Sequence, residues 1–229
     1  MTNSTFSANS AGNSGSGILN GGTLTVTNST FSANSANFGG GILNIGTLTV
    51  TNSTFSANSA VNSGGGVWNN GTLTVTGSTF SANSAGNSGG GIRVFSGTAT
   101  LKNTIIANST ASDNCYGAFA AGSTNNMATD ATCGASFTQV TTAQLNLGGL
   151  TGSPGYFPLN PGSLAIDAGT NSGCPSTDQR GVTRPQDGNG DSSAVCDIGS
   201  YESPDTTSPT LLSFTRFNPS VSPTNADTL

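Results

Sequence analysis

TNSTFSANSA at residues 2–11 returns letter for letter at 27–36 and 51–60, and with one change, as TGSTFSANSA, at 76–85. The phenylalanine of each copy therefore recurs every 24 or 25 residues, at Phe6, Phe31, Phe55 and Phe80. A second marker recurs at steps of 24, 25 and 26 residues, at Thr23, Thr47, Thr72 and Thr98. Two markers with one period of about 25 residues define a repeating structural unit, which predicts a solenoid.

The segment between the copies reads GGGILN, one further residue and then GTLTVT, as at 39–51, where the further residue is Ile45. In TLTVT, leucine and valine alternate with threonine, which is the period-2 pattern of a β-strand, and β-branched residues favour strands. If the units stack, the inward positions form columns: Leu24, Leu48, Leu73 and Ala99; Val26, Val50, Val75 and Leu101; Ile18, Ile42, Val67 and Ile92; and the four phenylalanines. We therefore expect an all-β, right-handed parallel β-helix of four to five coils over residues 1–112.

Asparagine also recurs at fixed positions of the repeat, in two sets: Asn34, Asn58 and Asn83, and Asn20, Asn44 and Asn69. Asparagine tolerates left-handed turn conformations, and stacked amides can hydrogen-bond along a column. We therefore expect a structural role. The glycosylation sequons NST at Asn3, Asn28 and Asn52 arise from the same repeat and carry little information about glycans.

Charge is scarce, because only 7% of the residues are charged against about 25% in an average domain. Residues 1–112 contain only Arg93 and Lys102, the formal net charge is −5, and there is no histidine. The absence of a basic stripe argues against nucleic acid, and no run of about 18 apolar residues predicts a membrane span. Met1 is followed directly by repeat sequence, so we expect a piece of a longer protein.

The four cysteines all follow the repeats. They form no CxxC pair and no histidine accompanies them, which argues against zinc and favours two disulfides in an oxidising, extracellular setting. Four cysteines allow three pairings. We favour Cys115–Cys133 and Cys174–Cys196, because the members of each pair are near in sequence.

The repeats resemble the right-handed parallel β-helix repeats of large bacterial surface proteins, and LKNTIIANST at 101–110 resembles their last coil. The tail at 161–202, PGSLAIDAGTNSGCPSTDQRGVTRPQDGNGDSSAVCDIGSYE, closely resembles the end of choice-of-anchor Q domain proteins. The resemblance implies a secreted or surface-anchored bacterial protein. It also implies a disulfide-bonded C-terminal cap, at 113–203, packed on the last coil. Residues 204–229 resemble a linker and the first strand of an Ig-like module.

Catalytic chemistry finds little support in the coils. Glycoside hydrolysis usually needs two carboxyl groups, and lyases need acidic calcium ligands and a base. Residues 1–112 contain no Asp, Glu or His, and no histidine is present to activate a serine. We therefore expect no catalytic residue and no required cofactor.

The C-terminal part is chemically richer. DGNGD places Asp187, Asn189 and Asp191 at alternate positions with Asp197 beyond, which resembles a calcium loop, although Ile198 stands where the closing glutamate would be. The alternative is an acidic turn without metal. A second polar group contains Asp167, Asp178, Arg180 and Arg184. We interpret this second group as salt bridges and turn caps rather than as a sugar-binding or catalytic cluster.

The outward threonines predict a regular surface that resembles the ice-binding face of some antifreeze solenoids. Its members are Thr23, Thr25, Thr27, Thr47, Thr49, Thr51, Thr72, Thr74, Thr76, Thr98 and Thr100. The ordinary alternative is that threonine pairs simply stabilise a sheet. Trp68, outward beside Leu19 and Leu43, is a candidate sugar-stacking platform.

Our leading hypothesis is a non-catalytic structural or adhesive segment of a bacterial surface protein. Ice binding and polysaccharide binding or cleavage are the alternatives, so the candidate partners are a glycan, ice or another surface protein.

Overall fold

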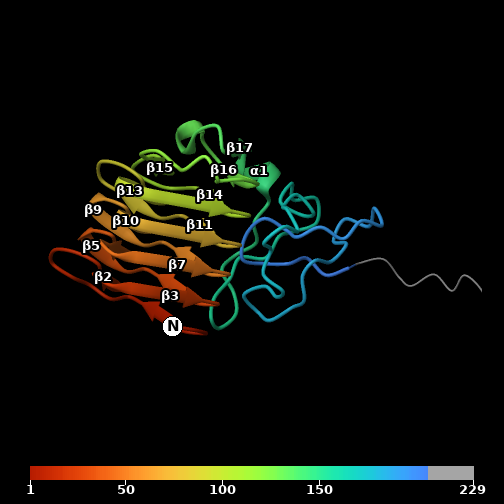
Figure 1. Ribbon diagram of the computed structural model, residues 1–229, viewed down its shortest axis with the longest axis horizontal. Helices are drawn as coiled ribbons and strands as arrows, with labels where there is room; N and C mark the ends of the chain where they lie inside the picture. Colours follow the sequence, from red (N-terminus) through yellow and green to blue (C-terminus); the bar gives the residue numbers. More distant parts are fainter. Residues whose placement is uncertain (206–229) are drawn as a thin grey trace, which may run out of the picture.

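The computed structural model describes residues 1–205. Within this range the chain forms a parallel β-solenoid whose strands stack as rungs (Figure 1), which confirms the predicted fold class. Apart from its first two residues, the segment expected to begin an Ig-like module, 204–229, lies outside the described residues.

Three parallel sheets make up the solenoid. The threonine sheet contains β2 (Ile18–Asn20), β3 (Thr23–Thr27), β6 (Ile42–Asn44), β7 (Thr47–Thr51), β10 (Val67–Thr76), β13 (Ile92–Lys102) and β15 (Cys115–Tyr116). The phenylalanine sheet contains β1 (Thr5–Ser7), β4 (Thr30–Ser32), β8 (Thr54–Ser56), β11 (Thr79–Ser81), β14 (Ile105–Ala107), β16 (Asn126–Ala128) and β17 (Phe137–Gln139). The short sheet contains β5 (Ser35–Phe38), β9 (Ser59–Ser63) and β12 (Ser84–Ala85).

The repeat positions stack in register. The rings of Phe6, Phe31, Phe55 and Phe80 lie parallel, with centroids 4.8, 4.8 and 4.4 Å apart. The amide of Asn34 donates to Asn58 Oδ1 at 2.8 Å, and the amide of Asn58 donates to Asn83 Oδ1 at 2.9 Å. Since these side chains are buried, each amide column satisfies polar groups that burial would otherwise leave unpaired.

One coil departs from the regular register. Between β10 and β13 the pairing shifts after Asn69, so that Asn70 lies opposite Ser96 and Phe95 is an extra, bulged residue. This bulge explains the single 26-residue step in the threonine marker. It also turns a large aromatic side chain out to solvent, since Phe95 is 59% exposed.

The solenoid extends beyond the boundary expected at residue 112. β15 pairs with β13, while β16 and β17 add two further strands to the phenylalanine sheet. The 3-10 helix η1 (Ala131–Cys133) brings Cys133 to Cys115, and both cysteines join the core of the coils. The first part of the expected cap therefore consists of irregular coils.

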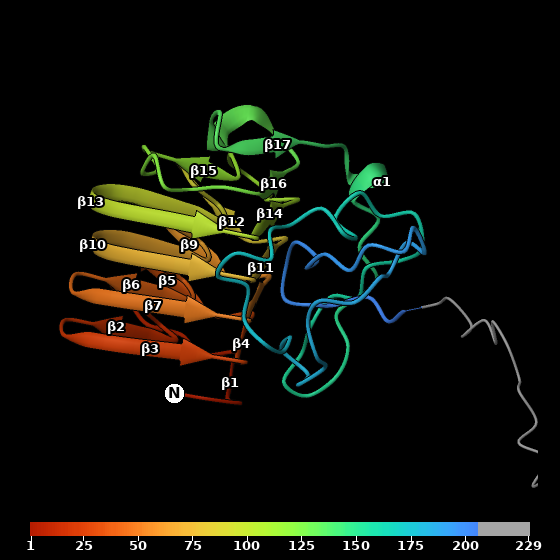
Figure 2. The same cartoon turned by 45° about the vertical axis from the view of Figure 1, so that its right-hand side comes forward.

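The remaining segment, residues 146–205, follows the short helix α1 (Thr142–Leu145). It runs back along the side of the phenylalanine sheet (Figure 2). The expected cap at 113–203 was to pack on the last coil, and this part of it contacts earlier coils as well. Three outward threonines of successive strands anchor it: Thr30 donates to Gly155 O at 2.6 Å, Thr54 to Gln179 Oε1 at 2.7 Å, and Thr79 accepts from Ser200 N at 3.0 Å. A stacked column of hydroxyls offers a bonding partner on every rung, and the segment uses several of them.

Both expected disulfides, Cys115–Cys133 and Cys174–Cys196, are present. They are consistent with an oxidising, extracellular location. Among residues 1–205, no helix has the length and apolar character required to cross a membrane.

Candidate functional surfaces

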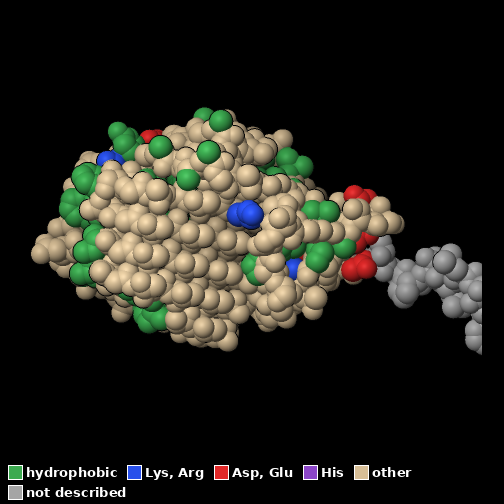
Figure 3. All heavy atoms as spheres, viewed as in Figure 1, with side chains coloured by type: hydrophobic (Ala, Val, Ile, Leu, Met, Phe, Trp, Pro, Cys, Tyr) green, Lys and Arg blue, Asp and Glu red, His purple; other side chains and the backbone are tan. Residues whose placement is uncertain are grey.

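The threonine face is the outward side of β3, β7, β10 and β13. Its first two columns pair rung by rung: Thr23, Thr47, Thr72 and Thr98, and Thr25, Thr49, Thr74 and Thr100. These side chains are exposed or half-buried, whereas the alternating apolar residues of β7, β10 and β13 are buried. The face over these strands is almost free of hydrophobic and charged side chains (Figure 3).

The third threonine column is less accessible. Thr27, Thr51 and Thr76 are half-buried, and the register continues the column to Lys102. The Lys102 ammonium donates to Ser172 O at 3.3 Å, which ties this end of the column to the C-terminal segment. The regular exposed array therefore consists of two columns rather than three.

An exposed apolar strip lies along the edge where the threonine and short sheets meet. We define the aromatic strip as Leu19, Phe38, Ile45, Trp68, Phe95 and Tyr116. Hydrophobic side chains gather along this edge of the solenoid (left in Figure 3). Leu19, Phe95 and Tyr116 are 57%, 59% and 50% exposed.

Ring contacts hold the aromatic strip together. The Trp68 ring stacks on Phe95 at 5.1 Å and meets the edge of Phe38 at 6.2 Å. The guanidinium carbon of Arg93 lies 3.9 Å from the centre of the Tyr116 ring. Trp68 is therefore half-buried among its neighbours rather than a free platform, and Leu43 beside it is buried.

Sequence reasoning identified Trp68 and the neighbouring Leu19 but missed the other four members of the aromatic strip. The register places Leu19, Leu43, Trp68, Arg93 and Tyr116 in one outward column. Phe38, Ile45 and Phe95 have no counterpart in the repeat unit, since serine, asparagine or glycine stands at or beside these positions in other coils. An apolar residue at a position that is polar or glycine in the other coils was the sequence signal that could have revealed them.

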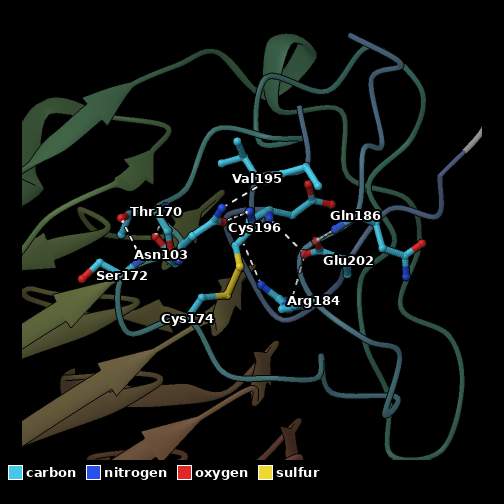
Figure 4. The surroundings of a disulfide bond; sticks show 12 residues. Asn103, Thr170, Ser172, Cys174, Arg184, Gln186, Val195, Cys196 and Glu202 are labelled. Carbon is cyan, nitrogen blue, oxygen red and sulfur yellow. Dashed lines mark hydrogen bonds and ion pairs between the residues drawn. A yellow bond between two sulfur atoms is a disulfide. The ribbon is translucent and has the colours of Figure 1, made fainter. Parts of the chain in front are cut away.

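The polar group of the C-terminal segment forms a buried network. Asp178 accepts hydrogen bonds from four donors and pairs with Arg180, with 2.6 Å between Oδ2 and Nη2. Arg184 donates to Asp197 O and Gly199 O, and its Nε lies 3.4 Å from Glu202 Oε2. Arg184 and Glu202 lie beside the Cys174–Cys196 disulfide (Figure 4).

Burial shifts the pKa values of the charged side chains in this network. It raises the pKa of Asp197 to about 6 and that of Glu202 to about 7. Burial likewise lowers the pKa of the Arg184 guanidinium, an effect that Glu202 opposes. Because Asp178, Asp197 and Glu202 are almost completely inaccessible, these carboxylates lock the segment in place and cannot contact a large substrate.

The four candidate calcium ligands do not all lie together. Asp187, Asn189 and Asp191 share one exposed loop, and the Asp187 carboxylate accepts from the backbone N–H groups of Gly190, Asp191 and Ser192. Asp197 points instead into the buried network, where it accepts from Asp167 N and Ser203 N. Within the described residues, no three Asp, Glu, Cys or His side chains gather in a way that could hold a metal. Calcium binding stays a prediction for this loop.

The sequons occupy corners of the solenoid. Asn28 and Asn52 adopt left-handed backbone angles, with φ of 48° and 46°. Asn52 is 2% exposed and its amide donates to Thr177 O, so that this side chain is inaccessible to a glycan in the folded chain.

No family model, no curated protein and no solved structure matches this chain. The resemblance of the tail at 161–202 to choice-of-anchor Q domain proteins therefore stays a proposal. The solenoid and the two disulfides rest on the structure itself.

Proposed function

We propose that this chain is a non-catalytic, extracellular segment of a bacterial surface protein, of the choice-of-anchor Q type, and that it adheres through the aromatic strip. The observation that carries the proposal is the strip itself. Contiguous exposed apolar side chains on an otherwise polar surface are typical of contact sites.

The composition of the coils supports a passive role. Residues 1–112 contain no carboxylate that could act as an acid, a base or a calcium ligand. Their two cations are engaged: Arg93 donates to Ser88 Oγ and packs on Tyr116, and Lys102 donates to Ser172 O. Stacked backbone ladders and amide columns suit a stiff, extended support that holds a contact surface outward.

Adhesion is tested by retention of the purified protein, under flow, on alkane-terminated and hydroxyl-terminated sensor surfaces. We expect strong retention on the alkane surface, and at least a fivefold loss in the double variant Leu19→Ser, Phe95→Ser, since each buried apolar side chain contributes about 1.5–3 kcal/mol. Leu164→Ser is the control, because Leu164 is also exposed, at 47%, but lies in the C-terminal segment. Equal retention of both variants, or release of products from pectate or alginate by the wild type, would contradict the proposal.

A second candidate function, ice binding, is favoured by the two exposed threonine columns. They form a flat, uncharged array with about 4.8 Å between rungs and about 6.7 Å along a strand. Thermal hysteresis and ice recrystallisation assays test it, with Thr49→Lys placing a charge in the array. Activity that survives this substitution would exclude the threonine face as the site.

A further inference from the structure

A polar pocket of about 640 Å³ lies between the first coils and the C-terminal segment. The coils contribute the corner asparagines Asn3 and Asn28, and the segment contributes Tyr156, Gln179, Arg180 and the chain at 152–154. It is separate from both the aromatic strip and the threonine face. Its volume is that of a typical small-ligand site.

The corner asparagines form a column that binds polar groups elsewhere in the solenoid. Asn103 pairs with Thr170 through both amide atoms, with Nδ2 donating to the carbonyl and Oδ1 accepting from the N–H, each at 3.0 Å. Asn52 Nδ2 donates to Thr177 O at 2.6 Å. The Oδ1 atoms of Asn28 and Asn52 are both buried without a hydrogen bond within residues 1–205, so this feature is shared along the column. The two corners differ at the side-chain amide, because the C-terminal segment accepts from Asn52 Nδ2 and offers Asn28 Nδ2 no such acceptor. At Asn28 the amide therefore lines the pocket as a free donor.

The opposite wall presents a cation and an aromatic ring. The Arg180 guanidinium lies 3.7 Å from the Tyr201 ring centre and 5.4 Å from that of Tyr156, and its hydrogen bonds use Nε and Nη2, which leaves Nη1 for a ligand. Gly152, with φ of 82°, makes room for this arrangement, since a Cβ there would approach the Tyr156 ring to 2.4 Å.

We propose that this pocket binds an acidic sugar unit of a polysaccharide. Sugar hydroxyls accept from the side-chain amides of Asn28 and Asn3, the ring C–H groups pack on Tyr156, and the carboxylate accepts from Arg180 Nη1. Arg180 is the only charged side chain among the lining residues, which favours an acid over a neutral sugar. Peptides are commonly recognised through apolar side-chain pockets, and apart from Tyr156 the lining offers only Pro154 for that purpose.

The test is a calorimetric and NMR titration of the chain with tetragalacturonate, cellotetraose and tetraglutamate. We expect saturable binding of tetragalacturonate that Asn28→Gly weakens about five- to tenfold, as loss of one to two hydrogen bonds predicts. Glycine preserves the fold at this corner, because Gly77 occupies the same position, with φ of 53°, in a later coil. Phe95→Ser, in the aromatic strip, is expected to bind as the wild type does, so this proposal fails or succeeds independently of adhesion.

Three results would overturn the assignment. The first is the absence of saturable binding to either oligosaccharide. The second is unchanged affinity in both Asn28→Gly and Arg180→Lys. The third is binding of cellotetraose or tetraglutamate as tight as that of tetragalacturonate, which would remove the acidic sugar as the ligand class.

Discussion

The repeated letters of TNSTFSANSA serve packing between identical neighbours. Asn58 illustrates this, because its Oδ1 accepts from the backbone N–H and the side-chain amide of Asn34, while its own amide donates to Phe31 O and Asn83 Oδ1. A change at one copy therefore disturbs the copies above and below it. Faithful repetition follows from these mutual bonds without a binding role.

Asn58→Ala is expected to lower the free energy of unfolding by about 2–4 kcal/mol, since several buried groups lose their partner at once. Chemical denaturation followed by circular dichroism measures the change. Asn87→Ala is the control, because Asn87 is exposed and makes one amide bond of 3.3 Å, and we expect a loss under about 0.5 kcal/mol. Comparable losses in the two variants would show that the amide column is not a major source of stability.

The raised pKa values of Asp197 and Glu202 predict that the stability of the C-terminal segment depends on pH. Their pKa values are raised from 3.8 and 4.5 to about 6 and about 7, so folding favours their protonated forms. The resulting stabilisation is complete below pH 3.8, and it is lost as the pH rises through about 6 and 7.

Amide hydrogen exchange at pH 5 and pH 8, corrected for intrinsic rates, is expected to show stronger protection of residues 196–203 at pH 5. Glu202→Gln removes one of the titrating groups and should reduce the difference between the two pH values. Stronger protection at pH 8 in the wild type would contradict the direction of the shifts.

At the scale of elements, the same residue type has two different roles on two sheets. Thr54 in β8 is buried and its hydroxyl contacts Gln179 Oε1 at 2.7 Å and Ser200 Oγ at 2.9 Å. Thr74 in β10 is also outward, but it faces solvent. The C-terminal segment thus covers the threonine column of the phenylalanine sheet and leaves that of the threonine sheet exposed.

Thr54→Val should destabilise the attachment of this segment by about 1–3 kcal/mol, because the buried Gln179 oxygen loses its donor while the side-chain volume is kept. Thr74→Val is the matched control, with an expected change within about 0.5 kcal/mol. Limited proteolysis of the segment reports the difference directly. Equal cleavage rates in the two variants would argue against lateral attachment through the threonine column.

The hydrogen bonds of the Asp187 loop are expected to contribute to the melting temperature of the protein. Asp187→Ala removes the acceptor of three backbone N–H groups, and we expect a lower melting temperature whether or not calcium is present. If the loop also binds calcium, the wild type melts at a higher temperature with Ca²⁺ than with chelator, and the variant does not. Identical wild-type melting in the two buffers would exclude a calcium role.

At the scale of the whole molecule, periodicity was sufficient to predict the coils, their register, the phenylalanine stack and the amide columns, because each position packs on its own copy. It could not predict the path of residues 146–205. The bonds of Thr30 and Thr54 to this segment each span 125 residues. Both sheets also present columns of outward threonines, and nothing in the sequence indicates which column the segment covers. The pocket at Asn28 was missed for the same reason, since it exists only where the segment leaves the corner column open.

The aromatic strip was only partly predictable. Trp68 was recognisable as a departure from the repeat, but the ring contacts depend on the bulge at Phe95 and on the coil that brings Tyr116 beside Arg93. Neither feature follows from the 25-residue period. Apart from Leu19, which belongs to the repeated ILN, the residues proposed to mediate adhesion are those that interrupt the repeat.

Hydroxyl-radical footprinting of the protein adsorbed on alkane-coated beads, read out by mass spectrometry, tests this central claim most directly. We predict strong protection of Leu19, Phe38, Phe95 and Tyr116 on adsorption, with unchanged labelling of Leu150 and Leu164, which are also exposed in the free protein. Protection confined to Leu150 and Leu164, or labelling of the aromatic strip that does not change on adsorption, would contradict the account.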